Sequence, residues 1–131
     1  MEKVYQFLKE SGVFFLATSE GSKPHVRAFG AVCKWEDKLY IATTNQKQVF
    51  KQMQNNPQIE ICALGENNTW IRIEAEAVVD SRREVRLQML EENPELKQMY
   101  SADDNIFEVL FLENATAAIC SYTEEPVVIR F

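Results

Sequence analysis

The amino-acid sequence predicts a mainly β domain of the α+β class, whose sheet curls into a barrel flanked by helices. About eight short segments are apolar throughout or alternate between apolar and polar residues, as strands do. Most of them are joined by short turns, which favours antiparallel pairing of strands that are neighbours in the sequence. Few segments have helical spacing, so a barrel is favoured over a doubly wound sheet. The patterns G-x-G-x-x-G and G-x-x-x-x-G-K-[ST] are absent, which excludes the usual dinucleotide and P-loop signatures.

The composition is that of one globular domain covering residues 1–131. Hydrophobic residues make up 46% of the chain and charged residues 26%, which argues against a disordered or fibrous protein. The chain does not start with a basic segment followed by an apolar one, so we expect neither a signal peptide nor a membrane span. Cys33, Cys62 and Cys120 are widely spaced and lie among apolar neighbours, which excludes a disulfide framework or zinc knuckle and favours a reducing compartment. We therefore expect a cytoplasmic protein.

The first part of the chain has the pattern of one helix and three strands. Val4 and Leu8 have helical spacing, and Gly12 ends that helix. Residues 25–35 alternate without interruption, which predicts one long strand, and Glu36–Lys38 closes a hairpin. In chain order we expect a helix at 4–11 and strands at 13–18, 25–35 and 39–43.

The period then changes to that of a helix. Met53 belongs to its apolar face, and Asn56–Pro57 ends it, because the residue before a proline avoids helical geometry. Thr44 or Asn45 is a good N-cap, and Asn45 with Gln48 has the spacing of a capping box.

The second half continues with strands and helices in turn. Trp70 to Val79 alternates cleanly, which predicts a half-buried strand. Ser81 with Glu84 is a second capping box that opens a helix, and Asn93–Pro94 breaks it and starts a shorter one. Leu96, Met99 and Tyr100 share one face of that shorter helix. The expected elements are strands at 59–64 and 70–79, a helix at 81–92, a shorter helix from 94, and strands at 107–112, 115–122 and 127–131.

The charges are distributed unevenly along the chain. The net charge is −6, which argues against general binding to nucleic acid or to anionic membranes. Residues 22–58 nevertheless carry six basic against two acidic side chains, a net of +4, and the rest of the chain has a net of −10. This basic stretch is either a small-anion site or a chance cluster of solvated lysines.

Thr43-Thr44-Asn45-Gln46-Lys47 is the best local candidate for a ligand site. It lies where a strand is expected to end and a helix to begin, and the first N–H groups of a helix lack internal partners. A positive charge such as Lys47 in the first turn interacts unfavourably with the helix dipole, unless an anion is bound there. The alternative is an ordinary capped helix with a solvated lysine.

Arg27 is the second candidate, because it is the only charge between Val26 and Cys33. A guanidinium on a largely apolar strand face needs a partner, since desolvating its charge is costly. That partner is either an acidic side chain of the same chain or a phosphate group held jointly with Lys47.

Trp70 and Arg72 share the polar face of their strand. Trp70 can stack on a ring system. For Arg72 we favour a structural role, an ion pair with Glu74 or Glu76 on a neighbouring element. Only one histidine is present, so histidine-dependent nucleophilic catalysis would have to use His25, which we expect to be exposed.

Three segments together resemble the pyridoxamine 5′-phosphate oxidase-like family, the FMN-binding split barrels. They are Lys23 to Phe29, Lys38 to Lys47, and Asn56–Pro57. Trp70-Ile71-Arg72-Ile73 and the acidic ending from Glu124 to Ile129 are similar to the general-stress and nitroimidazole-resistance-like branch of that family. The resemblance covers nearly the whole chain.

This resemblance implies a six-stranded split β-barrel with flanking helices, and a homodimer with two FMN sites at its interface. It implies that the strand beginning at Arg27 lies along the flavin and that Arg27 reaches the phosphate. Trp70 is implied to approach the flavin, often from the partner subunit. The cofactor-binding residues expected by resemblance are Arg27, Ala28, Phe29, Gly30, Thr43, Thr44, Asn45, Lys47 and Trp70.

Two functions from different classes follow. The first is an FMN-dependent oxidoreductase that moves electrons or hydride between a nicotinamide donor and a small acceptor. The second is a non-catalytic, stress-related flavin-binding module, and a ligand-free structural dimer is a more distant third. The sequence does not separate the first two, because a flavin brings its own redox chemistry and requires few protein groups. Catalytic residues therefore stay unassigned, and no metal site is expected.

Overall fold

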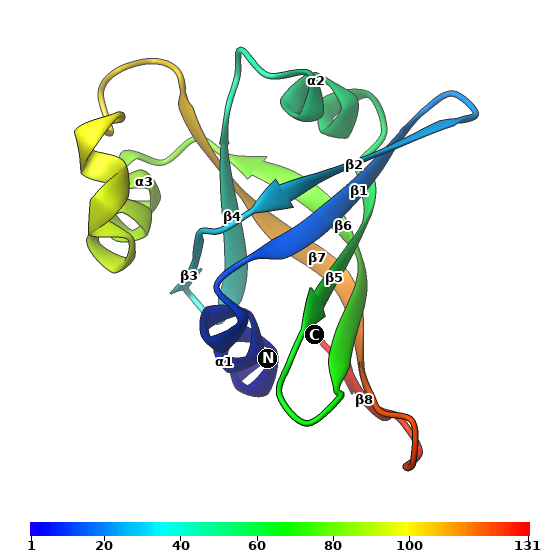
Figure 1. Ribbon diagram of the computed structural model, residues 1–131. Helices are drawn as coiled ribbons and strands as arrows, with labels where there is room; N and C mark the ends of the chain where they lie inside the picture. Colours follow the sequence, from blue (N-terminus) through cyan, green and yellow to red (C-terminus); the bar gives the residue numbers. More distant parts are fainter.

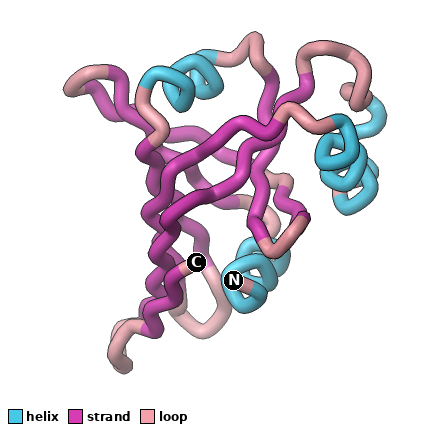
Figure 2. The backbone as a smooth tube through the Cα atoms, turned by 180° about the vertical axis from the view of Figure 1, so that it is seen from behind, coloured by secondary structure: helices cyan, strands magenta, loops and turns pink.

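One antiparallel sheet of eight strands forms the body of the structure, and three α-helices lie around it (Figures 1 and 2). The computed structural model describes the whole chain, residues 1–131. The strands are β1 (Phe14–Glu20), β2 (Lys23–Phe29), β3 (Val32–Trp35), β4 (Lys38–Thr44), β5 (Gln58–Leu64), β6 (Trp70–Asp80), β7 (Phe107–Cys120) and β8 (Val127–Arg130). The helices are α1 (Glu2–Ser11), α2 (Gln48–Asn55), α3 (Arg83–Glu92) and the short 3-10 helix η1 (Pro94–Gln98). None of the helices is long and apolar enough to cross a membrane.

The sheet curls so that its two edge strands follow one another in the chain. The strand order is β2-β1-β5-β6-β7-β4-β3, with β8 paired to β7. Phe29 at the end of β2 pairs with Phe14 of β1, whereas Val32 at the start of β3 pairs with Ile41 of β4. The two residues between β2 and β3 thus carry the chain from one edge to the other, and the barrel is split there. This confirms the predicted α+β split-barrel class; the eight strands match the number read from the sequence pattern, whereas the resemblance implied six.

Two predicted strand boundaries are wrong. The single strand expected at 25–35 is two strands, because the alternation of side chains continues through Gly30 and Ala31 while the pairing partner changes. Conversely, the two strands expected at 107–112 and 115–122 are one long strand, β7. The pairing of β7 with β6 shifts register between Glu74 and Glu76, so an irregularity replaces the expected break.

Both predicted capping boxes are also wrong. Helix α2 begins later than expected, with Lys47 as its N-cap, and α3 begins after Arg82. Neither N-cap residue makes a side-chain hydrogen bond to its helix. The side chain of Asn45 instead bonds the segment that leads into β7.

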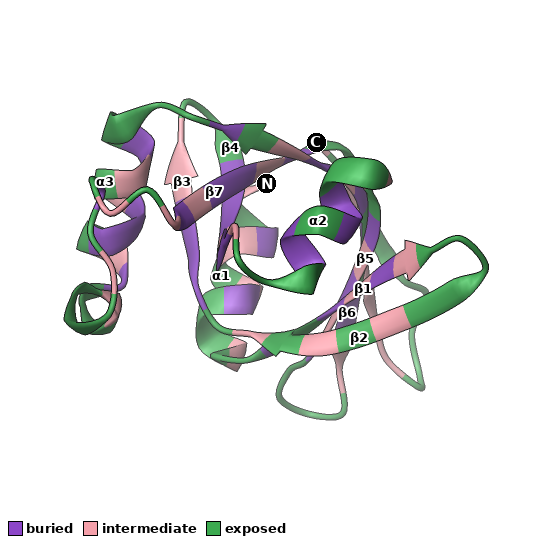
Figure 3. Cartoon of the chain, turned by 90° about the horizontal axis from the view of Figure 1, so that it is seen from above, coloured by how far each residue is buried: buried purple, intermediate pink, exposed green.

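The main core fills the barrel, and helices close its ends. Val4 and Leu8 of α1 are buried in it, and so are Val49, Phe50 and Met53 of α2. Figure 3 shows α2 with its buried face turned toward the strands, whereas β2 is exposed along much of its length. A second, smaller core lies between α3 and the strands β3, β4 and β7. The open edge at β2 is therefore poorly covered by the rest of the chain.

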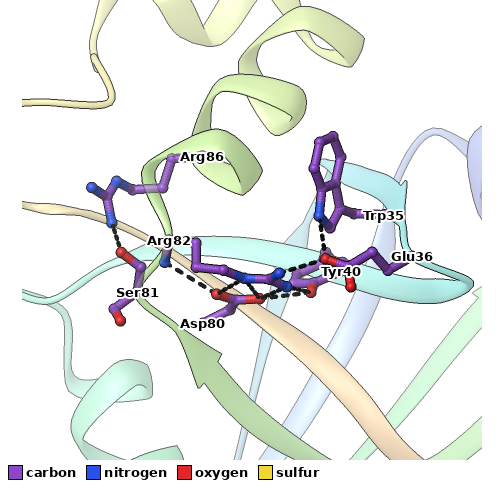
Figure 4. Close-up of polar contacts among 7 residues, drawn as sticks. All are labelled: Trp35, Glu36, Tyr40, Asp80, Ser81, Arg82 and Arg86. Atoms are coloured by element: carbon purple, nitrogen blue, oxygen red, sulfur yellow. Dashed lines mark hydrogen bonds and ion pairs between the residues drawn. The ribbon is translucent and has the colours of Figure 1, made fainter.

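A polar network ties the end of β6 to the turn between β3 and β4 (Figure 4). Tyr40 donates a hydrogen bond to Asp80 at 2.7 Å. Arg82 forms ion pairs with Asp80 at 2.8 Å and with Glu36, whose carboxylate also accepts a hydrogen bond from Trp35. The hydrogen-bonding groups of these side chains are paired with one another, so the network is structural.

Candidate functional site

A pocket of about 420 Å³ lies beside the connection between the two edge strands. Its walls come from the end of β2, from β4, from the start of α2, from η1 and the residues after it, and from the first residue of β7. Nine of its fifteen lining residues are hydrophobic. A mainly apolar pocket with a few polar groups is typical of small-molecule sites.

The pocket gathers six of the nine residues expected to bind a cofactor. The segment from Arg27 to Gly30 runs along one wall, and the polar groups face it from β4 and α2. The residues brought together are Arg27, Ala28, Phe29, Gly30, Thr43 and Lys47.

The other three expected residues do not line this pocket. Thr44 is buried and pairs with β7. Asn45 donates from Nδ2 to the carbonyl oxygen of Asn105 at 2.9 Å and to Glu108 at 3.0 Å, so its amide serves the structure. Trp70 is at the start of β6, where it packs against Tyr122 with ring centroids 5.0 Å apart.

Arg27 has only neutral partners in the protein. Its Nη1 donates to Thr18 Oγ1 at 2.9 Å, and its Nη2 donates to Gln52 Oε1 at 2.7 Å. Two backbone carbonyl oxygens complete the set. Burial lowers the pKa of the Arg27 guanidinium below its ordinary value, yet arginine remains charged in proteins. The acidic neighbour that was one alternative for Arg27 is absent.

Lys47 is the second cation at the pocket. It is exposed, it forms no ion pair, and it is the N-cap of α2. The first turn of α2 carries no acidic residue, so the partial positive charge of its free N–H groups is not compensated from within. Arg27 and Lys47 thus bring to one pocket two positive charges that form no ion pair within the protein, which is suited to an anion.

A second apolar part of the pocket lining was not predicted from the sequence. Tyr100 and Phe107 stack with ring centroids 5.3 Å apart and an interplanar angle of 23°, and both line the pocket. Leu96 and Met99 extend this apolar wall, and Glu95 adds a carboxylate that has no partner in the protein. The shared face of Leu96, Met99 and Tyr100 was visible in the sequence, but nothing indicated what it faces.

Other candidate residues have structural roles. Arg72 pairs with Glu60 of β5, with Nε 2.9 Å from Oε2. The expected pairing with Glu74 or Glu76 is therefore wrong. Strand pairing explains this, because Glu60 and Arg72 lie on the same face of adjacent antiparallel strands.

The cysteines and the histidine do not form a second site. All three cysteines are free, and burial raises the pKa of the Cys33 thiol to about 12, which makes it unreactive. His25 is partly exposed, lies 3.3 Å from Glu20, and does not line the pocket. No group of three or more potential metal ligands is present.

Comparison with known proteins places this fold in a family. The family model for pyridoxamine 5′-phosphate oxidase matches residues 1–115. Among solved structures, the chain is similar to a NimC/NimA family protein from Clostridium acetobutylicum, with 47% identity and a TM-score of 0.97, covering 100% of this chain and 92% of that one. No curated protein matches the chain significantly.

More distant structures share the fold. General stress protein 26 from Bacillus anthracis is 19% identical with a TM-score of 0.78, covering 99% of this chain and 97% of that one. A pyridoxamine 5′-phosphate oxidase-related, FMN binding protein from Nostoc punctiforme is 15% identical with a TM-score of 0.67, covering 99% and 95%. The family match and the similarity to the NimC/NimA protein together show that this chain belongs to the pyridoxamine 5′-phosphate oxidase-like family, as the resemblance predicted.

Proposed function

We propose that this protein binds FMN in the pocket beside the connection between β2 and β3. The observation that carries the proposal is a pair of cations, Arg27 and Lys47, which line a mainly apolar pocket and form no ion pair with any carboxylate of the protein. FMN combines a flat ring system with a phosphate group, and the pocket offers partners for both. Arg27, Lys47 and the hydroxyl of Thr43 would hold the phosphate. The FMN binding protein from Nostoc punctiforme, which shares the fold, supports the same cofactor.

The flat ring system has partners on two sides of the pocket. The strand segment from Ala28 to Gly30 and the ring of Phe29 would lie along one side of the flavin. The stacked rings of Tyr100 and Phe107 add a second apolar surface to the pocket.

We further propose that the protein is an oxidoreductase that uses a nicotinamide donor and a small acceptor. A bound flavin supplies the electron or hydride transfer itself. The tasks left to this chain are to hold the phosphate, to exclude water from one face of the ring, and to leave room for a substrate. The residue inventory supports this, since the pocket holds no histidine and no cysteine that could act as base or nucleophile. The aromatic walls suit a flat acceptor such as a quinone or a nitroaromatic compound.

A homodimer with flavin at its interface completes the proposal. The outward face of the sheet carries a row of side chains aligned by strand pairing from β2 to β8. The row consists of Ala28, Phe15, Cys62, Arg72, Ala118 and Val128. Phe15 and Val128 are about half exposed, and Val26 beside them is 69% exposed. A second copy of the chain would cover this surface and the open edge of β2.

The position of Trp70 agrees with a dimer. It lies on this outward face, at the same end of the sheet as the exposed side chain of Leu64. Trp70 does not line the pocket of its own chain. A role beside a flavin would therefore be played in the pocket of the partner subunit. The three free cysteines fit a reducing compartment, so we propose a cytoplasmic location.

Titration of the purified apo-protein with FMN tests the cofactor. We expect saturable quenching or enhancement of flavin fluorescence at micromolar concentrations. Riboflavin, which has the same ring but no phosphate, should bind more weakly. The absence of any saturable change with either compound would exclude a flavin site.

A further inference from the structure

Gln52 is a buried polar residue whose side chain serves Arg27. It is only 6% exposed and lies on the face of α2 that is turned toward β1. Its Oε1 accepts hydrogen bonds from Thr18 Oγ1 at 2.6 Å and from Arg27 Nη2 at 2.7 Å. Thr18 is also buried, and it accepts a hydrogen bond from Arg27 Nη1. Burying an amide oxygen in a core is costly unless it accepts hydrogen bonds, and here Oε1 accepts them from Arg27 and Thr18.

The donors of Arg27 show what this arrangement leaves free. A guanidinium has five N–H donors. Nη1 donates to Thr18 and to the carbonyl oxygens of Leu16 and His25, and Nη2 makes one bond, to Gln52. Nε has no partner in the protein. One edge of the guanidinium is thus fixed, while Nε–H and one N–H of Nη2 are left for a ligand.

All the acceptors that fix Arg27 are neutral. A carboxylate at the position of Gln52 would hold the guanidinium more strongly, but it would also cancel the charge that attracts an anion. The amide fixes the orientation of the side chain without that effect. Gln52 also connects Arg27 to α2, the helix whose N-cap Lys47 faces the same pocket.

We propose that Gln52 is the positioning residue of the anion site. It holds Arg27 in place for the phosphate of the bound flavin, and because it is uncharged it preserves the affinity of Arg27 for phosphate. Thr18 supports the same orientation from β1. This inference rests on the proposed FMN site. It gives Gln52, which does not line the pocket, a role in the selectivity of that site for phosphate.

The substitution Gln52→Glu tests the proposal, with FMN and riboflavin titrated in parallel. The new carboxylate pairs with Arg27, so FMN affinity should fall about tenfold or more, as expected for losing one charge-assisted contact. Riboflavin affinity should change less than twofold, because riboflavin has no phosphate. A merely structural role of Gln52 would weaken both compounds alike, so the ratio of the two affinities is the decisive readout.

Two further variants complete the experiment. Gln54→Glu places the same charge on an exposed position of α2 and should leave the ratio of affinities unchanged. Gln52→Met keeps the size of the side chain and removes the acceptor, so it should lower FMN affinity less than Gln52→Glu does. Circular dichroism checks that each variant is folded.

The outcomes distinguish this inference from the proposed function. A parent protein that binds neither flavin overturns both. A parent that prefers FMN to riboflavin, with a Gln52→Glu variant that keeps the same preference, overturns the role of Gln52 alone. Equal loss of both compounds in Gln52→Glu also overturns it.

Discussion

Tyr40 and Asp80, on two strands that β7 separates, are joined by a hydrogen bond of 2.7 Å from the phenol to the carboxylate. Tyr40 is fully buried and Asp80 is 8% exposed. Arg82 binds the same carboxylate through Nη2 at 2.8 Å and through Nε. The carboxylate is thus charged, buried and fully partnered, and it fixes the β6–α3 junction beside the pocket-bearing part of the barrel.

Replacing Tyr40 by Phe should destabilise the protein by about 1–3 kcal/mol, since a buried carboxylate loses one of its donors. Chemical denaturation at pH 7 measures the free energy of unfolding. Tyr122→Phe is the matched control, because Tyr122 is 83% exposed and its hydroxyl makes no hydrogen bond within the protein. Equal effects of the two substitutions would contradict the role given to the bond between Tyr40 and Asp80.

The same carboxylate makes stability depend on pH in the acid range. Hydrogen bonds from Arg82 lower the pKa of Asp80 from 3.8 to about 2. A folded-state pKa below the unfolded one stabilises the folded protein fully above pH 4, and this contribution is lost as the pH falls from about 4 through 2. It amounts to about 2 kcal/mol. Unfolding measured at pH 7, 4 and 3 should show about half of this loss in the parent by pH 3, and a smaller one in Asp80→Asn. A variant with the same acid sensitivity as the parent would assign the effect to other carboxylates.

The limits of prediction from sequence are clearest at the connection between β2 and β3. The alternation of side chains follows the backbone pleat and does not depend on which strand pairs with the segment. Residues 25–35 therefore had the pattern of one strand. The partner changes at Gly30 and Ala31, and this change both splits the barrel and creates the pocket. The barrel class itself was predictable because it depends on many short elements with short turns.

The site was predictable only in part, for a similar reason. Arg27 and Lys47, which both line the pocket, were predictable candidates because an isolated charge on an apolar strand and a lysine at a helix start are local signals. Gln52 was not found, because a glutamine on a helix gives no sign that it faces a guanidinium. The stack of Tyr100 on Phe107 joins residues that only tertiary structure brings to the pocket. Contacts between distant segments carry no signature in either segment alone.

Removing either cation should weaken FMN binding. Charge-assisted hydrogen bonds contribute about 1.5–3 kcal/mol each, so Arg27→Ala and Lys47→Ala should each lower FMN affinity about tenfold or more. Lys47 is exposed, so Lys47→Ala should keep the fold; Arg27→Ala also removes donors to the buried Thr18 and Gln52, so circular dichroism checks that this variant is folded. Fluorescence titration of each variant with FMN provides the measurement. Lys23→Ala, an exposed lysine of the same basic stretch outside the pocket, should bind as the parent does. Parent-like affinity in both pocket variants would place the phosphate elsewhere.

The proposed dimer predicts a mass of about twice 15.2 kDa by light scattering at micromolar protein. Val26→Glu and Phe15→Glu place charges on the outward face of the sheet and should shift the protein toward the monomer. Leu87→Glu places a charge on α3, which packs against β3 and β7 instead, and should leave the dimer intact. FMN should stabilise the dimer if both copies contact it. A parent mass near 15 kDa would refute the dimer outright.

Anaerobic mixing of the FMN-loaded protein with NADH or NADPH, followed by a panel of acceptors, tests the oxidoreductase proposal against the non-catalytic module. We expect at least one donor to bleach the flavin absorbance. Tight FMN binding without reduction by either donor would favour the module. His25→Ala should be reduced as the parent is, because His25 lies beside Glu20 near the tip of the β1–β2 hairpin and outside the pocket. Loss of reduction in that variant, with FMN still bound, would instead give the only histidine a direct part in the reaction. His25 does not line the pocket of its own chain. That result would therefore indicate that His25 reaches the flavin bound in the pocket of a partner subunit.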